Sequence, residues 1–148
     1  YDADSKTVLE ILDEFVHGPE MRLLPQLDDS IYWVKALREE GFLFHCITSV
    51  PMSQYENRIA NAEGLYGHGI FQRLECIGVT DSKADYLKRY AGTDCFWIED
   101  KPENALLGLD YGLKPLLMHH EYNRTFDDPR VQRVRGWKEV YETITNEL

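Results

Sequence analysis

The sequence predicts an α/β protein in which helices cover both faces of a parallel sheet. Short apolar runs bounded by turn residues indicate buried strands, and they alternate with segments whose apolar residues recur at helical spacing. A single helix separates each strand from the next, and such strand–helix–strand connections give parallel strands with right-handed crossovers. The expected architecture is therefore a doubly wound, Rossmann-like sheet.

The first half of the chain is expected to contribute three helices and one strand. Apolar residues at three- and four-residue spacing indicate helices over about residues 5–16, 30–40 and 54–63, which Gly18, Gly41 and Gly64 end. Asp28, Asp29 and Ser30 offer side chains that can cap the second helix. The apolar run 42–47 indicates a buried strand, and loops are expected over residues 21–27, 48–53 and 65–71.

The second half continues the alternation. The runs 74–79, 95–98 and 115–118 indicate three further strands, and helices are expected between them over residues 82–90 and 102–111. Pro102 suits the first turn of the second of these helices. Residues 119–135 are expected to form a polar loop, and the last helix has one apolar face made of Trp137, Val140, Tyr141 and Ile144.

Composition limits the kinds of partner. The 148 residues fit one domain, and a formal net charge of −10 argues against a nucleic-acid polymer, because phosphate backbones attract basic surfaces. No run approaches the roughly 20 apolar residues of a membrane span, and no signal peptide is visible. Cys46, Cys76 and Cys95 match no zinc spacing. We therefore expect buried free thiols in a reducing compartment and place the protein in the cytoplasm, with no membrane partner.

Polar groups that suit phosphate chemistry follow three successive strands: Thr48 and Ser49, then Lys83, then Glu99 and Asp100. Because the carboxyl ends of parallel strands meet at one edge of a sheet, we expect these groups to converge. Hydroxyl and backbone N–H groups at a strand-to-helix turn can hold phosphate oxygens, and a lysine neutralises charge. Paired carboxylates suit Mg2+. Together the groups suit phosphoryl transfer.

Each group also has a simpler explanation when it is taken alone. The hydroxyl pair can serve only as a helix cap, the lysine as a solvated surface residue, and the acidic pair as part of a polar turn. His119 and His120 follow the fourth strand, but no third metal ligand stands at suitable spacing, so we expect a structural or surface role for them. The order of the groups, hydroxyl pair, lysine and acidic pair, makes the phosphoryl-transfer interpretation specific.

Three phrases carry that order: FHCITSV over residues 44–50, DSKADYL over 81–87 and CFWIEDKPENA over 95–105. They resemble the second, third and fourth motifs of the haloacid dehalogenase (HAD) superfamily of hydrolases. The last phrase, followed by GLKPLLMHHEYN over residues 112–123, is similar to a phage and bacterial branch near the 5′(3′)-deoxyribonucleotidases. The resemblance covers nearly the whole chain.

The resemblance implies a Mg2+-dependent phosphomonoesterase that works through an aspartyl-phosphate intermediate on a small phosphorylated substrate, expected to be a nucleotide. Thr48 would hold the phosphate, with Ser49 as a second contact. Lys83 would pair with the phosphate and the nucleophile. Glu99 and Asp100 would bind Mg2+ directly or through water, and the sequence leaves open which of them is the direct ligand. It also leaves the oligomeric state open.

The family's first motif is a strand that ends in Asp-x-Asp, whose first aspartate is the nucleophile. Asp2 and Asp4 have this spacing, but no apolar strand precedes them, so we do not assign them as the catalytic pair. We expect residues 1–27 to be a remnant of a small helical cap and residues 28–148 to form the core of a single domain. The nucleophile strand, which would lie centrally in the sheet, is expected upstream of this sequence. The chain alone is therefore expected to be inactive.

Two other functions are compatible with parts of this pattern. A catalytically degenerate domain would bind a partner or a phosphorylated ligand without turnover; the absent first motif favours it, and the retained lysine and acidic pair oppose it. A receiver-like signalling domain would also place hydroxyl and lysine groups at strand ends. Its acidic residues should precede those groups, whereas Glu99 and Asp100 come last, so this function ranks lowest.

Overall fold

The computed structural model describes Arg22, Leu24 and residues 29–148. The helix expected over residues 5–16 and the Asp-x-Asp spacing at the start of the chain lie outside the described residues. Parallel strands and helices make up the described part, which confirms the α/β class. The doubly wound arrangement stays a prediction, because the strands form two separate sheets of two and three strands.

The chain divides into two compact units, each described here by itself. The first unit contains Tyr1–Gln26 and Gly41–Asp81, and the second contains Leu27–Glu40 and Ser82–Leu148. Of the predicted site residues, Thr48 and Ser49 belong to the first unit, and the lysine and the acidic pair belong to the second.

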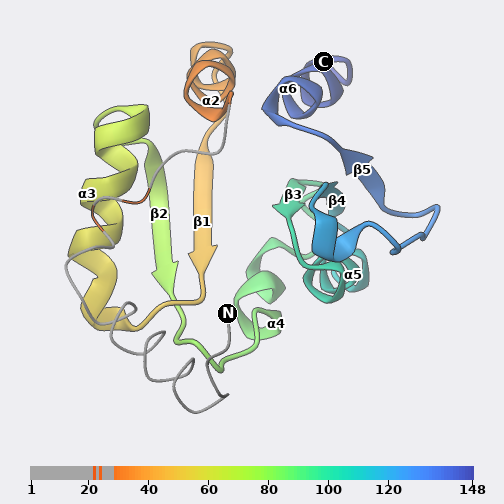
Figure 1. Cartoon of the computed structure of the whole chain (residues 1–148), viewed down its shortest axis with the longest axis horizontal. Helices are drawn as coiled ribbons and strands as arrows, with labels where there is room; N and C mark the ends of the chain where they lie inside the picture. Colours follow the sequence, from red (N-terminus) through yellow and green to blue (C-terminus); the bar gives the residue numbers. More distant parts are fainter. Residues whose placement is uncertain (1–21, 23, 25–28) are drawn as a thin grey trace. The chain divides into compact units, whose positions relative to one another are not determined.

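The first unit is a two-stranded parallel sheet with a helix beside it (Figure 1). Strand β1 (Phe44–Thr48) pairs with β2 (Phe71–Cys76), and helix α3 (Tyr55–Tyr66) packs against β2 after a short 3-10 helix (Met52–Gln54). The buried core consists of Val50, Leu74 and Cys76, with Leu24, Cys46, Ile59 and Phe71 packed against it.

The boundaries of β1, α3 and β2 all differ from the prediction by a few residues, and two of the differences have a plain reason. Helix α3 continues through Gly64, because that glycine is not among those with a positive φ and so does not turn the chain out of the helix. The helix ends instead before Gly67, whose φ of 105° suits a residue without a Cβ. Strand β2 begins before residue 74, because backbone pairing with β1 includes the polar Arg73 opposite His45.

The second unit contains a three-stranded parallel sheet. Its strands lie in the order β3 (Phe96–Glu99), β4 (Lys114–Met118) and β5 (Gln132–Val134). Helix α5 (Pro102–Asp110) packs against β3 and β4, and the short α4 (Ala84–Leu87) continues as a 3-10 helix (Lys88–Tyr90). A core cluster between α5 and β4 consists of Ala105, Leu117 and Val131, with Leu106, Leu109 and Phe126 packed against it.

Strand β5 was not predicted. Residues 119–135, expected to be one polar loop, contain both this strand and a 3-10 helix (Glu121–Asn123). In β5 the side chain of Val134 is fully buried, whereas Gln132 is exposed, so the three residues show no alternating apolar pattern. The strand forms because β4 offers a backbone edge, which local sequence does not reveal.

Helices α2 (Ser30–Glu39) and α6 (Trp137–Thr145) pack against each other in the second unit. The rings of Trp33 and Tyr141 lie 5.1 Å apart between centroids. Asp29 occupies the N-cap position of α2 as expected, but its side chain makes no capping bond there. Its carboxylate instead accepts hydrogen bonds from the first backbone N–H groups of α6.

The cysteine prediction is confirmed in part. None of the three cysteines forms a disulfide; Cys76 is buried, Cys46 is half-buried and Cys95 is exposed. Burial raises the pKa of the Cys76 thiol, which keeps it protonated. The prediction is wrong for Cys95, because that residue precedes β3 rather than lying within it. Among the described residues, no helix is both long enough and apolar enough to cross a membrane.

Candidate functional site

The acidic pair lies where β3 turns into α5. Glu99 is the last residue of β3 and Pro102 is the first of α5, so Asp100 and Lys101 form the whole connection. Oε2 of Glu99 accepts hydrogen bonds from the backbone N–H of Asp100 at 3.0 Å and of Lys101 at 3.2 Å. These N–H groups precede the helix and have no partner within it, so Glu99 holds the shape of the turn.

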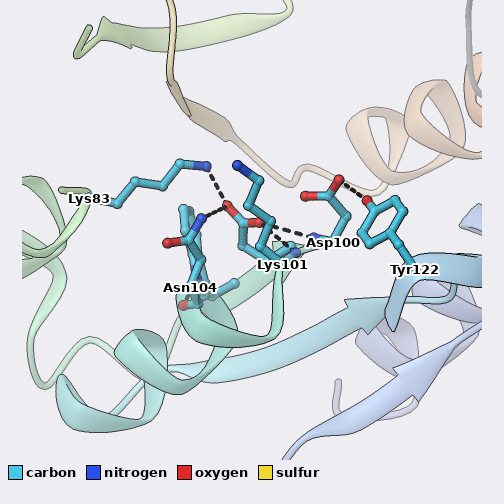
Figure 2. Close-up of polar contacts among 7 residues, drawn as sticks. Lys83, Asp100, Lys101, Asn104 and Tyr122 are labelled. Carbon is cyan, nitrogen blue, oxygen red and sulfur yellow. Dashed lines mark hydrogen bonds and ion pairs between the residues drawn. The ribbon is translucent and has the colours of Figure 1, made fainter. Parts of the chain in front are cut away.

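Lys83, immediately before α4, forms an ion pair with Glu99 (Figure 2). Its Nζ contacts Oε1, which also accepts the Asn104 Nδ2 at 3.4 Å. The pair is largely withdrawn from water, since the side chain of Lys83 is 13% exposed and that of Glu99 is 4% exposed. Desolvation of two charges is costly, and here their attraction and the additional hydrogen bonds offset it. The structure therefore brings two predicted site residues into direct contact.

Trp97 supports the lysine. The Lys83 Nζ lies 5.4 Å from the centroid of the indole ring, within the range of a cation–π interaction. The indole Nε1 donates to the Asn104 carbonyl oxygen at 2.9 Å, which orients the ring. A glycine at position 108 makes room for it, because a Cβ on Gly108 would lie 2.6 Å from the Trp97 Cδ1.

The carboxylate of Asp100 is held by Tyr122, whose hydroxyl donates to Oδ2 (Figure 2). Burial raises the pKa of Asp100, but hydrogen bonds, that from Tyr122 foremost, outweigh burial and hold this pKa below its usual value. Partial desolvation of its hydroxyl, together with the hydrogen bond to Asp100, raises the pKa of Tyr122 far above its usual value. At neutral pH the tyrosine is therefore protonated and the carboxylate is charged.

Asn123 fixes the main chain around Asp100. Its side-chain Nδ2 donates to the carbonyl oxygens of Asp100 and Met118, at 2.8 Å each. Arg133 of β5 donates to the Asn123 Oδ1 at 2.8 Å and to the Phe126 carbonyl oxygen at 2.7 Å. These bonds join the carboxyl ends of β3 and β4 to β5 around the acidic pair.

Both residues of the histidine pair make contacts in this region. The Nδ1 of His119 lies 3.1 Å from the Arg133 Nη1. The ring of His120 stacks on Tyr122, with centroids 5.0 Å apart and an interplanar angle of 6°. The pair therefore supports the loop that carries Tyr122, in line with the expected structural role.

Thr48 and Ser49 lie at the carboxyl end of β1, in the first unit. The Thr48 carbonyl oxygen accepts the backbone N–H of Val50 and of Ile77, both at 3.0 Å. The bond from Val50 closes a tight turn, and the bond from Ile77 extends the pairing of β1 with β2. Within the described part of the chain, no hydrogen bond involves either side-chain hydroxyl. A hydroxyl group can both donate and accept a hydrogen bond.

The donors at Asp100 fit a hard cation in part. Mg2+ usually takes one or two protein carboxylates and completes its coordination with water and substrate phosphate. Among residues 29–148, no group of three or more histidine, cysteine, aspartate or glutamate side chains is arranged to hold a metal. The acidic pair can therefore supply one carboxylate ligand, and further oxygen ligands would come from water, phosphate or other residues.

Sequence reasoning assigned no role to Asn104, Tyr122 or Asn123. Asn104 lies within the phrase CFWIEDKPENA, and Tyr122 and Asn123 lie within GLKPLLMHHEYN. The sequence therefore marked these segments, but it did not reveal the hydrogen bonds that the three side chains make with Glu99 and Asp100. No protein-family model matches the sequence, and no curated protein matches it either.

Proposed function

We propose that this chain forms the core of a Mg2+-dependent phosphomonoesterase of the HAD type, acting on a nucleotide through an aspartyl-phosphate intermediate. The observation that carries the proposal is the buried Lys83–Glu99 pair directly beside Asp100. A solvated lysine and a plain polar turn would not need this pairing. It supports the interpretation of two separate sequence phrases as parts of one charged site.

Within this proposal, Asp100 is the direct ligand of Mg2+ and Glu99 is not. The two carboxylate oxygens of Glu99 already accept from Lys83, Asn104 and the backbone of the turn, and the side chain is almost fully buried. The Asp100 carboxylate is more accessible and its pKa is lowered, so it is charged when a cation arrives. Glu99 instead orients the Lys83 ammonium group.

The chain's residues would then divide the work of phosphoryl transfer. Thr48 and Ser49 hold phosphate oxygens through their hydroxyls, and Lys83 neutralises charge on the phosphate and the nucleophile. Bound Mg2+ would polarise the phosphoryl oxygen and shield its negative charge from the attacking carboxylate. The nucleophilic aspartate would attack phosphorus and displace the alcohol, whose oxygen takes a proton from a general acid. Water would then hydrolyse the acyl phosphate, which restores the carboxylate and releases phosphate.

We also propose the doubly wound, Rossmann-like fold expected from the sequence, because the observed strands are parallel and alternate with helices. Among the described strands, β1 pairs with β2 alone and β3 pairs with β4 alone, so each leaves one edge without a described partner. An open strand edge of this kind can pair with a further strand.

The test is phosphate release from a panel of nucleoside monophosphates by the product of the whole gene, with and without Mg2+. We expect Mg2+-dependent release that Asp100→Asn and Lys83→Met abolish and that Tyr141→Phe, remote from the site, preserves. If the whole gene product binds nucleotides in the presence of Mg2+ but never releases phosphate, the non-catalytic binding domain replaces this proposal.

A further inference from the structure

The loop after β4 makes two contacts with a single residue of the candidate site. Asn123 is 2% exposed, and its Nδ2 donates to the Asp100 carbonyl oxygen at 2.8 Å. The neighbouring Tyr122 donates its hydroxyl to the Asp100 carboxylate (Figure 2). Adjacent residues of one loop therefore hold the main chain and the side chain of Asp100, across 22 positions of sequence.

The loop itself is fixed from several directions. Oδ1 of Asn123 accepts the His120 backbone N–H at 3.0 Å and the Arg133 Nη1 at 2.8 Å, and its Nδ2 also reaches Met118. This buried amide therefore uses both ends of its side chain, which restricts the backbone that carries Tyr122. The His120 ring stacked on Tyr122 further limits the directions in which the hydroxyl can point.

Tyr122 nevertheless remains at the surface, with 64% of the residue exposed. A tyrosine that served only to fill the core would be buried, and this one contributes little apolar burial. Its specific contribution is the hydrogen bond to the Asp100 Oδ2. A carboxylate that binds a cation through one oxygen commonly accepts a hydrogen bond on the other, and that bond sets its orientation.

We propose that Tyr122 is a positioning residue for cation binding at Asp100, holding Oδ2 so that Oδ1 is presented to Mg2+. The inference rests on the proposed function, because it assumes that Asp100 is a metal ligand. It goes further by assigning the orientation of that ligand to a residue in the loop after β4. Tyr122 does not touch the cation; it acts through the carboxylate that it holds.

The experiment is a Mg2+ titration of the full 148-residue chain labelled with 15N, followed through the backbone amides of Asp100 and Lys101. Tyr122→Phe removes the hydroxyl and keeps the ring on His120. Tyr141→Phe is the matched control, because the Tyr141 hydroxyl also donates to a carboxylate, that of Glu40 at 3.2 Å, in the α2–α6 pair. Asp100→Asn removes the proposed ligand, and each amide spectrum also reports whether the variant is folded.

We expect saturable shifts in the wild-type chain, none in Asp100→Asn, and a dissociation constant about tenfold higher in Tyr122→Phe with an unchanged melting temperature. Tyr141→Phe should bind as the wild type does. Equal or tighter binding by Tyr122→Phe would overturn the positioning role and leave the metal site of the proposed function intact. The absence of saturable shifts in the wild-type chain would remove that metal site and the inference with it.

Discussion

The carboxylate of Asp29 caps a helix that begins at Trp137, 108 positions later in the sequence. Oδ1 accepts the Trp137 backbone N–H at 3.1 Å, and Oδ2 accepts the Lys138 backbone N–H at 3.1 Å. The N-cap position of α6 is Gly136, which has no side chain to bond these groups. Asp29 supplies the missing acceptor, and its negative charge also suits the N-terminal end of the helix dipole.

Asp29→Ala should therefore destabilise the protein through α6 rather than through the helix that the residue precedes. Loss of a capping side chain costs about 1 kcal/mol of unfolding free energy. Urea denaturation would measure the change, and Glu39→Ala, at an exposed position in α2, is the control. Equal losses in the two variants would show that the capping contact contributes nothing specific.

The Lys83–Glu99 pair leads to a second prediction. Lys83→Met leaves a buried carboxylate without its counter-ion, which should cost about 3 kcal/mol of unfolding free energy. Adding Glu99→Gln removes the unpaired charge and should recover part of the loss, so the two changes will be strongly non-additive.

The control for the buried pair is Lys88→Met. Lys88 pairs with Asp85 at 2.9 Å on the exposed surface, where water and salt screen the interaction. Chemical denaturation should detect no change in this variant. Additive effects of Lys83→Met and Glu99→Gln would contradict the claim that the two side chains form one buried unit.

Sequence patterns predicted the parts of the fold that bury a regular apolar face. Helix α6 was predicted from four apolar residues at helical spacing, and the structure places it at Trp137–Thr145. Strand β5 was missed because its stability comes from pairing with β4 rather than from its own composition. The spacing of apolar residues indicates which face of a helix or strand is buried. It does not indicate that a strand distant in the sequence offers backbone groups for pairing.

The same distinction holds within the candidate site. Lys83 and Glu99 were both expected in one site, because each follows an apolar run in the strand–helix alternation, but their direct pairing was not predicted. The hydrogen bond from Tyr122 to Asp100 was not foreseeable, because it joins a loop to a strand end 22 positions away. No spacing rule connects those two positions.

A third prediction concerns acid pH. Asp128 accepts hydrogen bonds from the Arg130 Nη2 at 2.7 Å, Nε at 3.0 Å and backbone N–H at 2.9 Å, and these bonds lower the pKa of Asp128 from 3.8 to about 2. Because the folded state holds this proton less tightly, the pair stabilises the fold above the usual pKa. That contribution is lost as the pH falls from 3.8 to about 2.

Arg130→Leu removes the side-chain donors and should raise the pKa of Asp128 toward its usual value. The pKa of Asp128 will not return fully to its usual value, because the backbone N–H of residue 130 still donates to the Asp128 carboxylate. Titration of the carboxyl carbon by NMR measures this directly. Arg124→Leu, which disrupts a separate pair with Glu121, should leave the titration of Asp128 unchanged. If the pKa of Asp128 in Arg130→Leu equals that in the wild-type chain, then groups other than the Arg130 side chain lower it.

The last prediction compares two helical glycines whose surroundings differ. A Cβ on Gly108 in α5 would lie 2.6 Å from the Trp97 Cδ1, so Gly108→Ala must push the indole aside. Overpacking of this kind costs about 1–3 kcal/mol. It should also move the ring that lies beside the Lys83 ammonium group, which tryptophan fluorescence would detect.

Gly64→Ala provides the matched comparison, because Gly64 lies within α3 and a Cβ there would meet nothing within 4 Å. Alanine loses less backbone entropy on folding than glycine does, so this variant should gain about 0.5–1 kcal/mol. The two identical substitutions should therefore have opposite signs in urea denaturation. If both variants unfold with a higher free energy than the wild type, the Trp97 indole can move aside at no energetic cost. The indole would then not be a fixed support for Lys83.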